Sequence, residues 1–118
     1  MKDVLASKLG KGYVHGLNIC LEMELRDLQR LMAEIYLKRD EKRGAEKTLI
    51  WMLSEAGEVA DAFLKGDAQA LRDEVADLLA WLLSFCNVVK IDLEEAILAK
   101  YGDGCPICKS KPCRCPPK

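Results

Sequence analysis

Residues 67–89 read DAQALRDEVADLLAWLLSFCNVV, an apolar stretch with the three- and four-residue spacing of a helix. In its second half only Asp77, Ser84 and Asn87 are clearly polar, so this helix is apolar around nearly its whole circumference. A single small bundle would leave part of such a helix in water. We therefore expect it to be buried between subunits, in a homo-dimer or homo-tetramer.

The rest of the chain predicts further helices and no sheet. Apolar residues recur at helical spacing over residues 21–38 and 45–64. Asp67 is placed to cap the helix that follows it, and Asp92 is placed to cap a short helix over 93–100. Charged residues 39–44, ending in glycine, predict an exposed link. All four prolines lie after residue 105, and β-branched residues nowhere alternate with polar ones. The predicted fold class is all-α, a four-helix bundle-like arrangement with helices packed across an oligomer interface.

Composition and charge narrow the function classes. The 118 residues are 50% apolar, enough for one globular domain with its own core. Lysine and arginine number 18 against 19 aspartates and glutamates, a balance that argues against nucleic acid as a partner. No apolar run approaches the roughly 20 residues of a transmembrane helix, and the N-terminus lacks the apolar stretch of a secretory signal. We expect a cytoplasmic protein with no membrane partner.

Two pairs of acids lie one helical turn apart among apolar neighbours: Glu55 with Glu58, and Glu74 with Asp77. Asp77 lies within the apolar run VADLLAW, so we expect a buried carboxylate with a positive group beside it. Antiparallel packing of their helices would gather four carboxylates, whose mutual repulsion favours a bound divalent cation. Oxygen-only ligands suit Mg²⁺ or Mn²⁺, and the single histidine leaves no Glu-x-x-His pairs for a di-iron site. The alternative is that these acids form surface or inter-subunit ion pairs with Arg72, Lys65 or Lys47.

The sequence around these acids resembles a known family. SEAGEVA at 54–60, DEVADLLAWL at 73–82 and IDLEEA at 91–96 are similar to the MazG-like nucleotide pyrophosphohydrolases. That family carries Glu-x-x-Glu, a gap, then Glu-x-x-Asp, which is the pattern of the four acids here. The resemblance extends over residues 23–101.

The resemblance implies an all-α NTP pyrophosphatase fold, assembled as dimers or tetramers, and the reaction NTP + H₂O → NMP + PPi. It implies that the four acids are catalytic and hold Mg²⁺, one of them also polarising the attacking water. Asn87, Lys90 and Lys100 occupy equivalent places and are candidate substrate contacts, although a polar helix end explains the first two equally well.

Aromatic and basic residues near the acids have two interpretations each. Trp51 and Trp81 suit either a helical core or stacking on a base. The cations near the first link suit either a solvated surface or contact with a triphosphate, and they are Arg39, Arg43 and Lys47.

The two ends differ from the middle, which we delimit as a pyrophosphohydrolase domain over residues 21–102. Residues 1–20, which contain His15 and Cys20, carry no helical pattern and predict an N-terminal extension. The Cys/Pro-rich tail over 103–118 has four cysteines, namely Cys105, Cys108, Cys113 and Cys115. The C-x₂-C half is typical of a zinc knuckle, and the C-x-C half is tighter than usual, so structural Zn²⁺, disulfides and a disordered tail all remain open.

The sequence is therefore compatible with three functions. The first is Mg²⁺-dependent hydrolysis of NTPs or dNTPs that cleans the nucleotide pool. The second is a phosphoribosyl-ATP pyrophosphatase-like reaction. The third is a non-enzymatic oligomeric helical module whose zinc-binding tail recruits a partner, with the four acids as structural ion pairs.

Overall fold

The computed structural model describes residues 22–118, and all of its regular structure is helical. Four helices follow one another along the chain: α2 (Leu25–Arg43), α3 (Ala45–Lys65), α4 (Ala68–Val89) and α5 (Leu93–Tyr101). Over this range no strand is present, which confirms the predicted all-α class. The predicted N-terminal extension lies outside the described residues, and the division of the chain at 20/21 and 102/103 stays a prediction.

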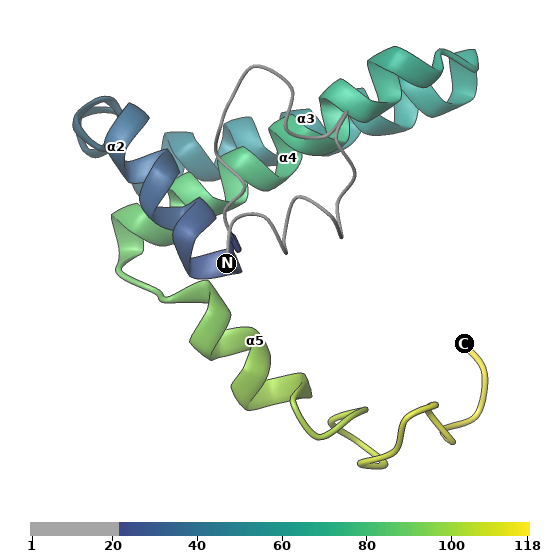
Figure 1. Cartoon of the computed structure of the whole chain (residues 1–118). Helices are drawn as coiled ribbons and strands as arrows, with labels where there is room; N and C mark the ends of the chain where they lie inside the picture. Colours follow the sequence, from purple (N-terminus) through teal and green to yellow (C-terminus); the bar gives the residue numbers. More distant parts are fainter. Residues whose placement is uncertain (1–21) are drawn as a thin grey trace.

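Helices α3 and α4 form a long antiparallel hairpin, and α2 crosses it near one end (Figure 1). The hairpin turn uses Gly66, which ends α3 in the left-handed region at φ 71°, where a side chain is disfavoured. Asp67 then begins α4, because its side chain accepts a hydrogen bond of 3.0 Å from the amide of Ala70. The predicted hairpin and its cap are both confirmed.

The first link was predicted wrongly. We expected an exposed charged segment over 39–44, but α2 continues through Arg43 and only Gly44, at φ 90°, separates it from α3. The charges neutralise one another inside the helix, since Arg43 lies 2.8 Å from Asp40, whose side chain is almost completely buried. Arg43 also donates to the hydroxyl of Thr48, 3.3 Å away on α3. The charged run 39–43 thus had the sequence pattern of a surface loop, but it holds an ion pair within α2 and, through Arg43, a hydrogen bond to α3.

Helix α5 extends away from the hairpin and is fastened to the start of α2 (Figure 1). Arg26 forms ion pairs with Asp92 at 2.8 Å and with Glu94 at 3.0 Å. Asp92 also caps α5, as predicted, by accepting a hydrogen bond from the amide of Glu95. These contacts hold the start of α5 against the start of α2.

Few apolar side chains of residues 22–118 are fully buried: they are Ala62, Leu83 and Cys86. On α3, by contrast, Ile50, Leu53 and Leu64 are exposed by 65%, 61% and 82%. The hairpin therefore presents apolar surface to its surroundings. Within the described range, no helix combines the length and the hydropathy needed to cross a membrane.

Candidate functional site

The hairpin brings the two predicted acid pairs together. Glu55 on α3 and Glu74 and Asp77 on α4 each offer a carboxylate oxygen, and these three oxygens lie within 4.8 Å of one another. Glu58 lies outside that group but is close enough to contribute to the electrostatic repulsion on Glu74. The register of α3 against α4 thus builds an acidic cluster, which we define as these four residues.

In the part of the chain that the structure describes, no cation forms an ion pair with the acidic cluster, although the charge of Lys65 is close enough to interact with that of Glu58. None of the ion pairs among residues 22–118 includes any of its four members, and Lys65 pairs instead with Asp61, at 2.9 Å. The pKa of the Glu74 carboxyl is raised, first because burial disfavours its charge and then because of Glu55. The arrangement suits a divalent cation better than the alternative of structural ion pairs.

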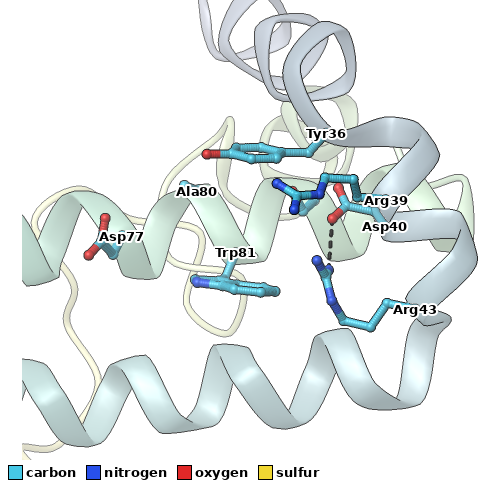
Figure 2. A pocket seen from close by; sticks show the side chains of 8 residues that line it. Tyr36, Arg39, Asp40, Arg43, Asp77, Ala80 and Trp81 are labelled. Carbon is cyan, nitrogen blue, oxygen red and sulfur yellow. Dashed lines mark hydrogen bonds and ion pairs between the residues drawn. The ribbon is translucent and has the colours of Figure 1, made fainter.

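The surroundings of Asp77 differ from the prediction. Its apolar sequence neighbours led us to expect a buried carboxylate beside a positive side chain, but in this chain Asp77 is exposed. Val75 and Leu79 beside it are themselves 50% and 39% exposed, and the Asp77 side chain reaches the edge of a pocket (Figure 2). Asp77 therefore joins the acidic cluster to an accessible space.

That pocket has a volume of about 320 Å³ and lies between α2 and α4. Asp77 lies at one end and the basic side chains of Arg39 and Arg43 at the other, with Trp81 between them (Figure 2). The remaining lining residues are Tyr36, Asp40, Ala80 and Ser84. A pocket with an acidic end, an aromatic wall and a basic end suits a polar ligand that contains an aromatic ring.

The two tryptophans lie in contact rather than in a closed core. Their rings stack with centroids 5.8 Å apart and planes inclined by 16°. Trp51 is 52% exposed, while Trp81 is half-buried and has the Arg43 guanidinium 4.7 Å from its ring centroid. Core packing therefore does not describe Trp81, which lines the pocket, and its stacking on a base stays a prediction.

Asp40 is a pocket residue that sequence reasoning missed. One of its carboxylate oxygens binds Arg43, and the other, Oδ2, is buried with no hydrogen-bond partner among the described residues. A buried oxygen without a partner is costly, so it marks a place where a donor is needed. Its pattern in the sequence, one acid in a run of charges, gave no signal of this.

The predicted substrate contacts are not brought to the acidic cluster. Asn87 follows Asp77 by ten residues on α4, a rise of about 15 Å along a helix. Its amide exchanges hydrogen bonds of 3.1 Å with Gln29 of α2, and it lines a second pocket with Lys90. Lys100 on α5 lies 5.6 Å from the ring centroid of Tyr101. A substrate role for Asn87, Lys90 and Lys100 stays a prediction.

The four C-terminal cysteines also form a cluster. Their sulfur atoms all lie within 4.8 Å of one another, with 3.8 Å between Cys105 and Cys115 and 3.9 Å between Cys108 and Cys113. Backbone amides surround them: that of Arg114 donates to Cys108 and that of Cys115 donates to Cys113, both at 3.3 Å.

The amide donors make the sulfur atoms unequal as acids. The Arg114 amide is the main reason that the pKa of Cys108 falls to about 6, and amides of Cys108 and Ile107 lower that of Cys105. Hydrogen bonding with Cys113 is the largest cause that raises the pKa of Cys115, to about 11. The cluster therefore favours thiolates at some positions even without a positive charge nearby.

Comparison with known proteins agrees with the geometry. Residues 43–108 match the model of the MazG nucleotide pyrophosphohydrolase domain, a range that includes the whole acidic cluster. Two curated relatives, dCTP pyrophosphatase 1 of Bos taurus and of Rattus norvegicus, are each 30% identical over 94 residues. The aligned part covers 67% of this chain but 56% and 55% of those proteins, so the chain spans little more than half of their length.

Proposed function

Because the chain belongs to the MazG nucleotide pyrophosphohydrolase domain family, we propose that it hydrolyses nucleoside triphosphates or deoxynucleoside triphosphates to the monophosphate and pyrophosphate. The observation that carries this proposal is the acidic cluster, whose four carboxylates form no ion pair among the described residues and which reaches a pocket through Asp77. The expected role is removal of unwanted nucleotides from the cellular pool.

We propose that Glu55, Glu58, Glu74 and Asp77 hold Mg²⁺, or Mn²⁺ in its place, since their oxygens match the ligands these ions prefer. The bound metal would neutralise charge on the triphosphate and lower the pKa of a coordinated water. One carboxylate of the cluster accepts a proton from the attacking water. The water oxygen bonds to the α-phosphorus, the bond to the α,β-bridging oxygen breaks, and pyrophosphate leaves.

The pocket suggests how a nucleotide lies against the cluster. With its phosphates at the Asp77 end, the base lies against Trp81 and Tyr36, which supply aromatic surface. Asp40 lines the same pocket, and a movement of its side chain would turn the unpartnered oxygen, which is buried in this structure, toward a donor on the base. The exocyclic amino group of cytosine is a donor of this kind, and the two curated relatives are named for dCTP. We therefore place dCTP first among the substrates to test.

The test is release of pyrophosphate and monophosphate from a panel of NTPs, dNTPs and phosphoribosyl-ATP in the presence of Mg²⁺. The native chain is compared with Glu55→Gln, Glu58→Gln and Asp77→Asn, each of which removes one ligand charge. Asp73→Asn is the matched control, because Asp73 lies next to Glu74 on α4 but outside the cluster. We expect turnover by the native and control chains and a loss of at least 100-fold in the cluster variants.

Each outcome separates the alternatives. Turnover of phosphoribosyl-ATP alone would select the related pyrophosphatase reaction. No turnover together with no Mg²⁺ binding by calorimetry would reject the enzyme and favour the non-enzymatic module. Circular dichroism of every variant establishes that the helices are intact.

We also propose that the active form is a homo-dimer or homo-tetramer. Residues Ile50, Leu53, Gly57, Ala60 and Leu64 of α3 follow one another at spacings of three, four, three and four, and all five are exposed. This spacing places them on one stripe of a helix, as in helices that pack against a partner helix. A second copy of the chain, carrying the same stripe, is the partner that covers it.

A further inference from the structure

The C-terminal cysteines lie where a tetrahedral metal would hold them. A zinc ion bound to four thiolates at about 2.3 Å places each pair of sulfur atoms about 3.8 Å apart. The separations of 3.8 Å between Cys105 and Cys115 and of 3.9 Å between Cys108 and Cys113 agree with that value, and all four sulfur atoms lie within 4.8 Å of one another. We propose that Cys105, Cys108, Cys113 and Cys115 bind one Zn²⁺ and that this ion holds residues 104–115 in their folded form.

The backbone around the cysteines is arranged to aim sulfur atoms inward. The amide of Cys105 donates to the carbonyl of Ser110 at 2.9 Å, and that of Lys109 donates to the carbonyl of Cys105 at 2.7 Å. These bonds close a tight turn between the first two ligands. Gly104 begins it at φ 110°, and an added Cβ would lie 2.8 Å from the carbonyl oxygen of Ser110. The turn therefore requires glycine at this position.

The segment has little else to stabilise it. Ile107, its one large apolar side chain, is 81% exposed, so no apolar core forms there. So short a segment without a core depends on a cross-link or a metal for its fold. The amides that donate to Cys108 and Cys113 favour metal, because thiolate ligands carry negative charge that such donors stabilise.

The ligand set selects the metal class. Four soft sulfur donors favour zinc over Mg²⁺, which prefers oxygen. Protein ligands would fill all four coordination positions of the ion, which is the arrangement of structural rather than catalytic zinc. This centre is separate from the acidic cluster and does not depend on the proposed hydrolysis.

The experiment is metal analysis of the 118-residue chain, expressed in zinc-supplemented medium and purified under reducing conditions. Elemental mass spectrometry gives the number of zinc ions per chain. We expect one zinc per chain, with Cys113→Ser losing most of it. Cys86→Ala is the matched control, because Cys86 is buried in α4 and offers no sulfur to the cluster. Both variants should keep the native helical circular dichroism, since the cluster lies outside the helices.

A second measurement uses Co²⁺ on the apo chain. We expect the thiolate-to-cobalt charge-transfer band and the visible bands of tetrahedral coordination, displaced by one equivalent of Zn²⁺. Removal of zinc should also deprotect the amides of Cys105 and Lys109 to hydrogen exchange. Iron in place of zinc, a native mass lower by four hydrogens that indicates two disulfides, or no metal in the native chain would each overturn the proposal.

Discussion

At the scale of single residues, Gln29 shows how one buried amide organises a junction. Its Nε2 donates to Asn87 at 3.1 Å and to the carbonyl of Ile91 at 2.7 Å, and its Oε1 accepts from the amide of Leu93 at 3.0 Å. It therefore connects α2 to the end of α4 and to the start of α5. Each backbone group it serves would lack that partner if the amide were removed.

Replacing Gln29 by leucine should lower the free energy of unfolding by about 2–3 kcal/mol, because it breaks three hydrogen bonds and leaves buried groups unsatisfied. Chemical denaturation at one fixed protein concentration measures the change. Gln69→Ala is the control, since Gln69 is exposed and contacts only Asp73. Equal stability of the two variants would show that the junction does not depend on the Gln29 amide.

Single residues were also where the sequence informed least. The four acids could be chosen because their spacing and the family resemblance mark them, and the structure gathers three of them closely. Gln29 could not, because its partners lie on α4 and at the start of α5. Asp40 could not, because its burial depends on how α2 packs in the folded chain. The burial of Asp77 was predicted wrongly, because its apolar sequence neighbours Val75 and Leu79 are themselves exposed in the single chain.

At the scale of elements, the short helix α5 depends on electrostatics at its start. Asp92 caps it and binds Arg26, and these contacts hold the pKa of Asp92 below its usual range, the amide of Glu95 being the largest cause. A lowered pKa means that the folded state favours the charged carboxylate. The stabilisation is therefore complete above the unfolded pKa of about 4 and is lost as the pH falls through the lowered folded value.

This predicts that stability falls below about pH 4 and that Asp92→Asn weakens the fall, because asparagine can cap but cannot titrate. Urea unfolding between about pH 2 and pH 6 tests it, with Asp103→Asn as control for an acid outside the caps and ion pairs of the described chain. Parallel curves for the native chain and Asp92→Asn would contradict the assignment.

The helix boundaries show why elements were predicted better than links. Periodic apolar residues and the caps at Asp67 and Asp92 marked α3, α4 and α5 to within a residue or two. The predicted end of α2 lies five residues before the observed one, because Asp40 and Arg43 in the charged run 39–43 form an ion pair within the helix. A charge pattern alone does not distinguish an exposed loop from a helix with an internal ion pair.

At the scale of the whole molecule, the stripe of α3 from Ile50 to Leu64 is an apolar surface that the single chain leaves exposed. Gly57 lies in its middle, and an added Cβ there would meet no atom within 4 Å in the single chain. The stripe is therefore open to close approach by another helix. From the sequence, we expected an apolar surface in contact with another subunit only on α4, which is apolar nearly all round. The stripe on α3 could be recognised only after the structure showed which residues of α3 remain exposed.

Leu53→Glu should convert the proposed oligomer to monomers, raising the dissociation constant by at least about 100-fold, since an unpaired charge in an apolar interface is costly. Light scattering coupled to gel filtration measures the mass over a dilution series. Leu98→Glu on α5 is the control, because Leu98 is equally exposed at 61% but lies outside the stripe. A native chain that is monomeric at every concentration would reject the oligomer.

The single residue Gly44 has a consequence for how this chain tolerates change. Insertions in surface connections usually cost little, because longer loops lose only slightly more entropy. Here α2 and α3 meet across one residue, so the length of the connection sets how far Tyr36 and Arg39 stand from Asp77 and Trp81. Adding residues at this point would free α2 to move away from the hairpin. The one-residue connection at Gly44 thus limits the width of the pocket between α2 and α4.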